Sequence, residues 1–228
     1  MSKQTAITLH PVHNYTFGIK EAAVERDPDM AIRMDRLRDR YHKEGMRQSV
    51  EGILLVHEHN HPHVILFQHG TKEKPSFRLI GGRLRPGEDE ISGLIRKLDS
   101  SLSPLGTSLV LKWQIGECIG MFWRPNFEEH LYPYLPAHIT RPKEAKRLFM
   151  VHLPDRAYFA VPKNLNLKAI PLFELYSNQV LYGSLLAALP QMVSRYRFNL
   201  AGSVQPIAAP KASNAATSLP ETTATTAN

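Results

Sequence analysis

The chain has 228 residues, 43% of them hydrophobic, which is enough to fold around a sizeable core. Lys and Arg number 28 against 21 Asp and Glu, and the formal net charge of +7 favours an acidic partner such as nucleic acid. The single cysteine, Cys118, excludes an internal disulfide and is expected to be buried as a small hydrophobic residue. No apolar run is typical of a signal peptide or a membrane span, so we expect a soluble protein of a reducing intracellular compartment, without a membrane partner.

The N-terminal residues 1–25 are mixed in character and include Tyr15 and Phe17, which predicts an ordered arm. The following pattern predicts a helix over residues 28–43, which begins at an Asp-Pro pair and ends before Gly45. Its apolar stripe consists of Met30, Met34, Leu37 and Tyr41. The neighbouring basic stripe, interpreted as a solvated helix face, consists of Arg33, Arg36 and Arg40.

Two β-rich runs, at residues 49–57 and 63–69, predict a hairpin around a His-Pro turn. Four histidines alternate along it, namely His57, His59, His61 and His63. Imidazole is a common zinc ligand, but this spacing is not typical of a zinc site and no cysteine lies nearby. We therefore expect exposed strand and turn histidines rather than a metal site.

A short strand at residues 77–80 leads into a glycine-rich loop and then a helix over residues 88–100, which ends before a proline. Strand-like segments follow at residues 109–120 and 147–153. A last helix is predicted at residues 184–196, with Pro190 near a kink or break. A sheet interrupted by helices predicts an α/β fold, namely a layered α/β/α sandwich with helices on both faces of the sheet.

Two segments have unusual composition. The segment 122–138, FWRPNFEEHLYPYLPAH, is too apolar for a linker, so we expect it either to pack on the core or to form a protein interface. Residues 201–228 consist mainly of Ala, Ser, Thr and Pro, and this composition predicts a disordered tail. We therefore divide the chain into an N-terminal arm and helix at 1–44, a folded domain at 45–200, and the tail.

The loop and helix at residues 81–104 resemble the signature of Nudix hydrolases, G-x5-E-x7-R-E-U-x-E-E-x-G-U, in which U is a bulky apolar residue. The residues that fit its register are Gly82, Glu88, Arg96 and Leu98. The three glutamate positions that should follow hold Lys97, Ser100 and Ser101. Nudix chemistry uses a divalent cation held by clustered carboxylates, so we expect no catalytic residues, no metal and no other cofactor. The remaining acids, Glu88, Asp89 and Glu90, are interpreted as first-turn residues that cap the helix and complement its dipole.

Longer segments, spread over residues 9–199, are similar to the small Nudix subunit of pre-mRNA cleavage factor I, a non-catalytic protein of mRNA 3′-end processing. Among them are LHPVHNYTFGIKE, GMRQSVEGILLVHEH, GGRLRPGEDE and WRPNFEEHLYPYLPAHITRPKE. The resemblance implies a Nudix-type α/β/α sandwich with a mixed sheet. It also implies a nuclear homodimer that binds UGUA elements in pre-mRNA and associates with a larger subunit carrying an RNA-recognition motif.

By position, the resemblance implies that RNA is bound by Glu25, Arg33, Glu51, Phe77, Leu79, Tyr182 and Gly183. It also implies that Tyr132 and Tyr134 contact the larger subunit. Carboxylate and guanidinium groups can read base edges, and aromatic rings can stack on splayed bases. The chain departs from the family in the loop 71–77, which is longer and places Ser76 where the family has a base-stacking phenylalanine. Two alternatives stay open: a Nudix hydrolase or nucleotide-binding protein for dinucleoside polyphosphates, and a dimeric scaffold without RNA specificity of its own.

Overall fold

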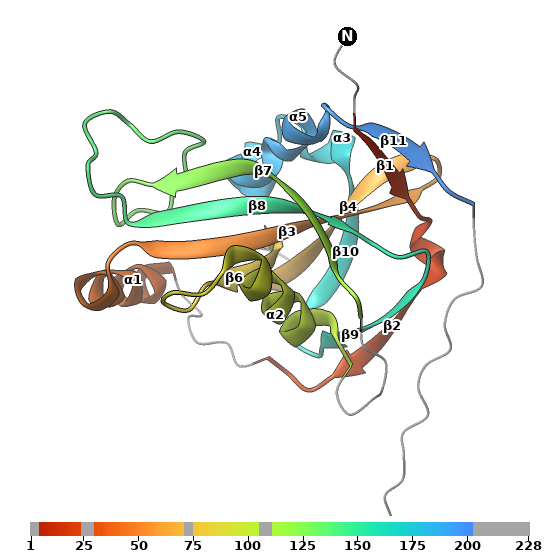
Figure 1. Cartoon of the computed structure of the whole chain (residues 1–228), viewed down its shortest axis with the longest axis horizontal. Helices are drawn as coiled ribbons and strands as arrows, with labels where there is room; N and C mark the ends of the chain where they lie inside the picture. The colour runs from red at the N-terminus through yellow and green to blue at the C-terminus, as the bar shows by residue number, and fades with distance from the viewer. Residues whose placement is uncertain (1–4, 24–29, 71–74, 105–110, 203–228) are drawn as a thin grey trace, which may run out of the picture.

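The computed structural model describes residues 5–23, 30–70, 75–104 and 111–202 (Figure 1). A seven-stranded sheet forms its centre, with strand order β10–β4–β3–β8–β7; β5 also pairs with β4, and β6 with β3. These strands are β3 (Arg47–Glu58), β4 (His61–Gly70), β5 (Pro75–Arg78), β6 (Ile80–Arg83), β7 (Gln114–Arg124), β8 (Glu144–His152) and β10 (Asn166–Pro171). No helix of the described residues is long and apolar enough to cross a membrane.

The long strand β3 has three partners, which makes the sheet mixed. It runs parallel to β8, from Arg47 opposite Glu144 to Leu54 opposite Val151. On its other side it pairs antiparallel with β6 through its first half and with β4 through its second half. The predicted β3–β4 hairpin is confirmed, but its turn is the pair His59 and Asn60, at φ values of 50° and 64°. Positive φ at both central residues is typical of the two-residue type I′ turn, so Pro62 lies within β4 instead.

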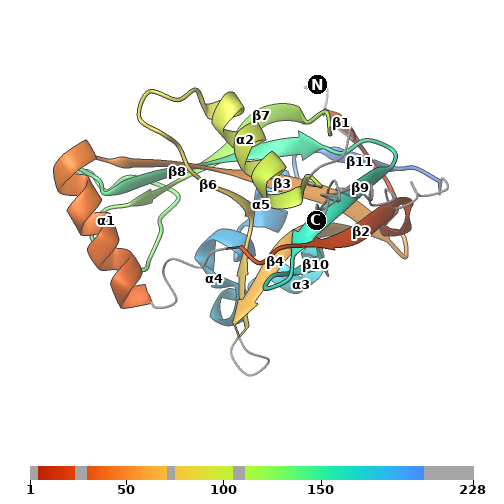
Figure 2. The ribbon, with the colours of Figure 1, turned by 90° about the horizontal axis from the view of Figure 1, so that it is seen from below.

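Helices cover both faces of the sheet, as predicted. The helix α2 (Glu90–Leu102) lies on one face, whereas α3 (Leu172–Leu175), α4 (Gln179–Ala187) and α5 (Leu189–Val193) lie on the other (Figure 2). Strand residues alternate between the two cores: Val50 and Leu54 pack with α2, whereas Ile53 and Leu55 pack with α4 and α5. The structure is therefore an α/β/α sandwich with a mixed sheet. We refer to its two sides as the α2 face and the α4 face.

The N-terminal arm is built into this sandwich by two parallel pairings. Strand β1 (Ala6–Leu9) pairs with β11 (Arg197–Leu200), near the end of the described chain. A short 3-10 helix, Val12–Asn14, leads to β2 (Tyr15–Lys20), which pairs with β9 (Ala157–Pro162). The arm is ordered over these residues, as expected. The predicted disordered tail is residues 201–228, and from residue 203 onward it lies outside the described residues.

Three sequence-based predictions of local structure were wrong in detail. The predicted single helix is two helices, of which the second ends at Val193. The break between them at Ala188 confirms the predicted break near Pro190, which lies in the first turn of α5, where its missing N–H has no cost. Cys118 is exposed, because β7 is an edge strand whose pairing with β8 is irregular between residues 115 and 120, and such an irregularity redirects side chains. His57 and His63 are buried, since both faces of the hairpin are covered, while His59 and His61 are exposed.

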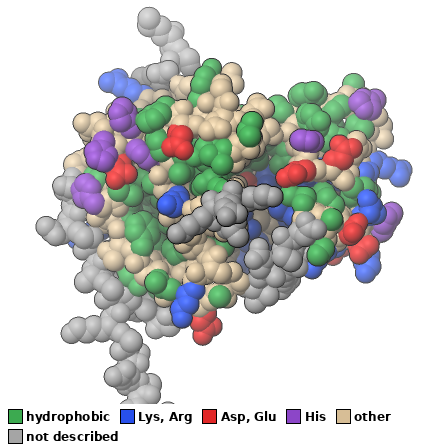
Figure 3. All heavy atoms as spheres, turned by 180° about the vertical axis from the view of Figure 1, so that it is seen from behind, with side chains coloured by type: hydrophobic (Ala, Val, Ile, Leu, Met, Phe, Trp, Pro, Cys, Tyr) green, Lys and Arg blue, Asp and Glu red, His purple; other side chains and the backbone are tan. Residues whose placement is uncertain are grey.

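The helix α1 (Met30–Glu44) agrees with prediction over its described length; its expected start at residues 27–29 lies outside the described residues. It lies at one end of the sheet, next to the start of β3 (Figures 1 and 2). Its apolar residues Met34 and Leu37 are buried. Viewed from behind, charged side chains gather at this end of the molecule (Figure 3). The α1 end of the sheet is therefore the charged end.

Candidate nucleic-acid interface

An aromatic pair lies on the α4 face. Strand β5 carries Phe77, whose ring lies 4.9 Å from the ring of Tyr182 in α4, at an interplanar angle of 47°. The hydroxyl of Tyr182 donates a hydrogen bond to the carboxylate of Glu174, and burial together with this bond raises the pKa of Tyr182. Leu79, two residues beyond Phe77, is buried in the same core. The structure thus brings Tyr182 together with Phe77 and Leu79, although more than 100 residues separate Tyr182 from the other two in sequence.

Gly183 interrupts α4 directly after Tyr182. Its backbone angles, φ 80° and ψ 166°, are not helical and belong to a region that residues with a side chain rarely adopt. A Cβ added there would meet no atom within 4 Å among the described residues. The glycine is therefore required by its conformation and not by crowding, and it leaves a stretch of backbone open beside the aromatic pair.

Glu51 lies in β3 on the α4 face. It is only 8% exposed, and Lys146 of β8 donates to it with Nζ 2.6 Å from Oε1. Its position depends on Gly81, which lies opposite it in β6. A Cβ on Gly81 would come within 2.2 Å of the carbonyl oxygen of Val50 and 2.6 Å of the Cα of Glu51, so β6 can approach β3 this closely only with glycine at that position.

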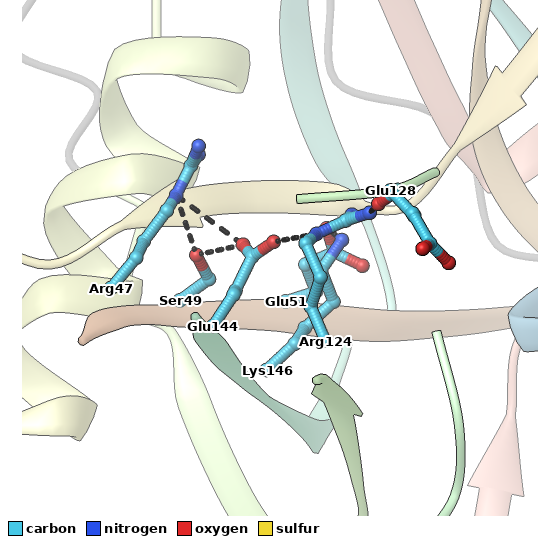
Figure 4. Close-up of polar contacts among 7 residues, drawn as sticks. All are labelled: Arg47, Ser49, Glu51, Arg124, Glu128, Glu144 and Lys146. Carbon is cyan, nitrogen blue, oxygen red and sulfur yellow. Dashed lines mark hydrogen bonds and ion pairs between the residues drawn. The ribbon is translucent and has the colours of Figure 1, made fainter. Parts of the chain in front are cut away.

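A second buried carboxylate, Glu144, lies beside the Glu51–Lys146 pair (Figure 4). Its Oε2 accepts from Arg124 Nε at 3.0 Å, and its Oε1 accepts from the hydroxyl of Ser49 at 2.7 Å and lies 3.3 Å from Arg47 Nε. Burial alone would raise the pKa of Glu144, but Arg47, Lys146 and Arg124 surround it and lower the pKa to about 2. This network ties β3, β7 and β8 together and holds Lys146 next to Glu51.

The acids at the start of α2 each have a partner. Asp89 is the N-cap and accepts from the backbone N–H of Ser92 at 3.0 Å, which confirms its predicted capping role. Glu88 instead binds Arg96, with Nε 2.6 Å from Oε1, and accepts from the backbone N–H of Arg85. The bonds from Arg96 and then from Arg85 lower the pKa of Glu88 to about 2. Glu90 forms an ion pair with Arg147.

A basic cleft, with a volume of about 620 Å³, lies between α1, the loop 81–88 and β5. Among the described residues, its lining contains eight Arg and Lys side chains against two Glu side chains, a formal surplus of six positive charges. Arg33 lies here, as do Arg36 and Arg40, so this helix stripe, which was interpreted as a solvated face, lines a cleft together with cations of other elements. No pattern in the sequence indicated that Arg83, Arg85 and His69 join them, although the net charge of +7 already indicated a basic surface.

The expected RNA-binding residues therefore fall into two groups. Phe77, Leu79, Tyr182 and Gly183 lie together on the α4 face, where Glu51 also lies, whereas Arg33 lies in the basic cleft. Strand β5 joins the two, because Arg78 lines the cleft while its neighbour Phe77 packs on the α4 face. Glu25 lies outside the described residues.

The two expected partner-binding tyrosines lie side by side and are accessible. Tyr132 pairs with Trp123 through two backbone hydrogen bonds of 2.7 and 2.8 Å, which fix the segment after β7. The rings of Tyr132 and Tyr134 are 6.0 Å apart, and these residues are 37% and 60% exposed. Phe127 of the same segment packs on Tyr41 of α1. The segment thus packs against the fold at one end and exposes aromatic side chains further along.

Comparison with known proteins decides the family. A Nudix family model, described as a nucleotide hydrolase, matches residues 5–196. Pre-mRNA cleavage factor Im 25 kDa subunit 2 of Arabidopsis thaliana is 52% identical over 203 residues, which cover 89% of this chain and 100% of that protein. Cleavage and polyadenylation specificity factor subunit 5 of Dictyostelium discoideum is 48% identical over 199 residues, which cover 87% of this chain and 97% of that protein. The chain belongs to the Nudix family, among the cleavage factor Im 25 kDa subunits.

Among solved Nudix structures, the dihydroneopterin triphosphate pyrophosphohydrolase of E. coli aligns with a TM-score of 0.43 and 13% identity, over 64% of this chain and 92% of that one. Nudix hydrolases hold a divalent cation with carboxylates, and the residues of α2 do not fit one. Lys97 lies beside the glycine pair, with its Cε 3.2 Å from the position of a Cβ on Gly82. Among the described residues, no group of three or more His, Cys, Asp or Glu side chains could hold a metal ion.

Proposed function

We propose that this chain is a non-catalytic, RNA-binding subunit of the machinery that cleaves and polyadenylates mRNA 3′ ends in the nucleus. The identity of 52% over the whole length of a cleavage factor Im 25 kDa subunit carries this proposal. The absence of catalysis follows from the chemistry of α2, where Lys97, Ser100 and Ser101 stand in place of carboxylates.

The proposed ligand is single-stranded RNA that contains UGUA. The partly exposed ring of Phe77, which packs on the buried ring of Tyr182, offers an aromatic surface for a splayed base, and the open backbone at Gly183 lies next to it. The carboxylate of Glu51 can accept hydrogen bonds from a base edge with Oε2, because its Oε1 is taken by Lys146. Arg33, and Glu25 by position, complete the proposed set.

The subunit is proposed to act as a homodimer that associates with a larger subunit carrying an RNA-recognition motif. The accessible pair Tyr132 and Tyr134 supports the second contact, since aromatic residues are enriched at protein interfaces. Exposed apolar side chains on α3, α4 and the turn between them, among them Phe173, Tyr176 and Val180, support association between copies, because such a patch is costly to leave in water. Light scattering over a concentration series measures the dimer.

A binding titration of the full-length protein tests the RNA proposal. We expect an RNA with UGUA to bind more tightly than the same RNA with the G changed, and we expect Arg33→Ala to reduce this preference. The matched control is Arg156→Ala, an exposed arginine between β8 and β9, at the other end of the sheet from α1. Equal binding of both RNAs to the wild-type protein would reject UGUA recognition and favour a scaffold without RNA specificity of its own.

A further inference from the structure

The basic cleft contains more positive charge than the expected UGUA-reading residues account for. Arg33 is the only one of those residues that lines it, among the residues described. The other charges come from separate elements: Arg40 from α1, Arg47 from β3, and Arg83 and Arg85 from β6 and the loop after it. At least three separate segments of the chain thus direct cations towards one space.

These cations lie close enough to oppose one another. Burial lowers the pKa of Arg47; Glu144 acts against this, but Arg33, Arg124 and Arg40 lower it further. Burial and then Arg40 lower the pKa of Arg83, which is paired with Glu44. Within the described part of the chain, no ion pair or hydrogen bond of the Arg33 or Arg40 side chain is found. An anion in the cleft would relieve this repulsion.

A neutral hydrogen-bonding group lies among the cations. The Nε2 atom of His69 is buried and has no hydrogen-bond partner among the described residues. Burial, followed by Arg78 and Arg33, lowers the pKa of His69 to about 4, so this imidazole is uncharged at neutral pH. A buried polar atom without a partner is rare in folded proteins, and a ligand in the cleft would supply one.

The lining also indicates which part of a nucleic acid fits. Tyr41 is the only Phe, Tyr or Trp among the lining residues within the described chain, and its ring already contacts Phe127 and lies 4.3 Å from Lys143 Nζ. A nucleobase therefore finds no free aromatic ring among the described residues that line the cleft, whereas phosphate groups find several guanidinium groups. Several cations spread over a long cleft suit a chain of phosphates better than a single one.

We propose that the basic cleft binds the sugar-phosphate backbone of the RNA that flanks the recognised element, without a metal ion. This inference rests on the proposed function, because RNA bound at Arg33 would enter the cleft directly. Lys97 and the arginines would contact the phosphates themselves, where a Nudix hydrolase would use carboxylates and a divalent cation. The same scaffold position would thus bind phosphate with protein cations in place of metal.

Salt dependence of RNA binding tests this proposal. The full-length protein and its Arg40→Gln/Arg85→Gln variant are titrated, by fluorescence anisotropy, with a short RNA that holds only UGUA and with a longer RNA that has flanking nucleotides. Each lost phosphate contact lowers the slope of log affinity against log salt by about 0.7 for single strands. We therefore expect the slope for the longer RNA to fall by about 1.4 and its affinity at 0.15 M salt to fall about tenfold.

The matched control is Lys112→Gln/Arg156→Gln, which removes the same two charges from exposed positions at the opposite end of the sheet. It should leave the slope unchanged, and an equal fall in both variants would overturn the proposal because net charge alone would then explain it. An unchanged slope in the cleft variant would also overturn it. Titration with ATP is the third arm: if Arg40→Gln/Arg85→Gln abolishes ATP binding and leaves the RNA slope unchanged, the cleft binds free nucleotides instead.

The test of the basic cleft and the test of UGUA recognition have separate readouts, so one proposal can fail while the other stands. The ratio of affinities for UGUA RNA and for RNA with the G changed reports on base recognition, and the cleft variant should leave this ratio unchanged. A ratio of one in the wild-type protein would reject UGUA recognition, while the loss of salt dependence in the cleft variant would still support a backbone-binding cleft.

Discussion

Glu88 and Arg96 form a two-point ion pair, with Arg96 Nε 2.6 Å from one carboxylate oxygen and Nη2 2.5 Å from the other. The pair joins the loop after the glycine pair to the second turn of α2. Both oxygens of Glu88 are occupied, and the backbone N–H of Arg85 donates to one of them as well. A carboxylate bound in this way serves the loop conformation and is not available to a cation.

We therefore expect no hydrolysis of diadenosine tetraphosphate in the presence of Mg²⁺. Neither Mg²⁺ nor Mn²⁺ should raise the thermal unfolding temperature, because a ligand that does not bind the folded state cannot stabilise it. Chromatography of the nucleotide after incubation and a thermal scan measure these outcomes. Turnover that Glu88→Gln abolishes, while the exposed Glu129→Gln leaves it intact, would establish a hydrolase instead.

The buried carboxylate of Glu144 should be important for stability. Glu144→Gln leaves Arg47, Arg124 and Lys146 without their shared anion, and removing one partner of a buried ion pair costs about 3–5 kcal/mol. Urea unfolding of the variant at neutral pH measures this loss, with Glu129→Gln as the exposed control. A loss equal to that of the control would contradict the role assigned to the network.

The same carboxylate predicts how stability depends on pH. Its pKa is about 2 in the folded protein, below the ordinary value of 4.5, so its contribution is complete above pH 4.5 and is lost as the pH falls from there towards 2. The difference in unfolding free energy between the wild-type protein and Glu144→Gln should shrink over that range. If the difference in unfolding free energy stays constant as the pH falls towards 2, the charge of Glu144 is not the stabilising feature.

Phe77 is expected to replace the stacking phenylalanine that the longer loop lacks. Phe77→Leu keeps an apolar contact with Tyr182 but removes the ring, and one base–aromatic stack is worth about 1–3 kcal/mol. The affinity for UGUA RNA should therefore fall by about 5- to 150-fold, while Phe17→Leu, on β2, should have no effect. Unchanged affinity of Phe77→Leu would assign base stacking to another residue.

The tyrosine pair after β7 should be needed for the larger subunit and not for folding. Tyr132→Ala/Tyr134→Ala should lose co-purification with a larger cleavage factor subunit, because both rings are accessible and lie together. The variant should unfold at the wild-type temperature within a few degrees, since only backbone atoms of Tyr132 bond to Trp123. His130→Ala, exposed in the same segment, is the control, and equal retention of the partner by all three proteins would place the contact elsewhere.

The sequence predicted those parts of the fold that depend on local patterns. The helix α1, the β3–β4 hairpin and the loop before α2 follow from apolar periodicity and from Gly and Pro at their ends. The break at Gly183 agrees with the predicted helix start at residue 184, but the helical residues from Gln179 to Tyr182 were missed, because their conformation depends on packing against β5. Cys118 was misjudged for a related reason, since the irregular pairing of β7 depends on its neighbour and not on its own residues.

The site was less predictable than the fold. The residues Glu51, Phe77 and Tyr182 are distant in sequence and were connected only through the family resemblance. The cleft shows the same limit: Arg40 and Arg83 come together because α1 packs at the end of the sheet, and no periodicity in either segment indicates this. Net charge predicted that a basic surface exists, while its position depends on tertiary packing.

The pairing of β1 with β11 has a consequence for how the protein is made. Residues 6–9 leave the ribosome well before their partner residues 197–200, because nearly the whole folded part of the chain separates the two strands. The first strand must therefore wait, with its backbone unpaired, until residues 197–200 have emerged, and contacts of such long sequence separation form slowly. A nascent chain stalled before residue 197 would thus expose an unpaired β1 strand to chaperones or to aggregation.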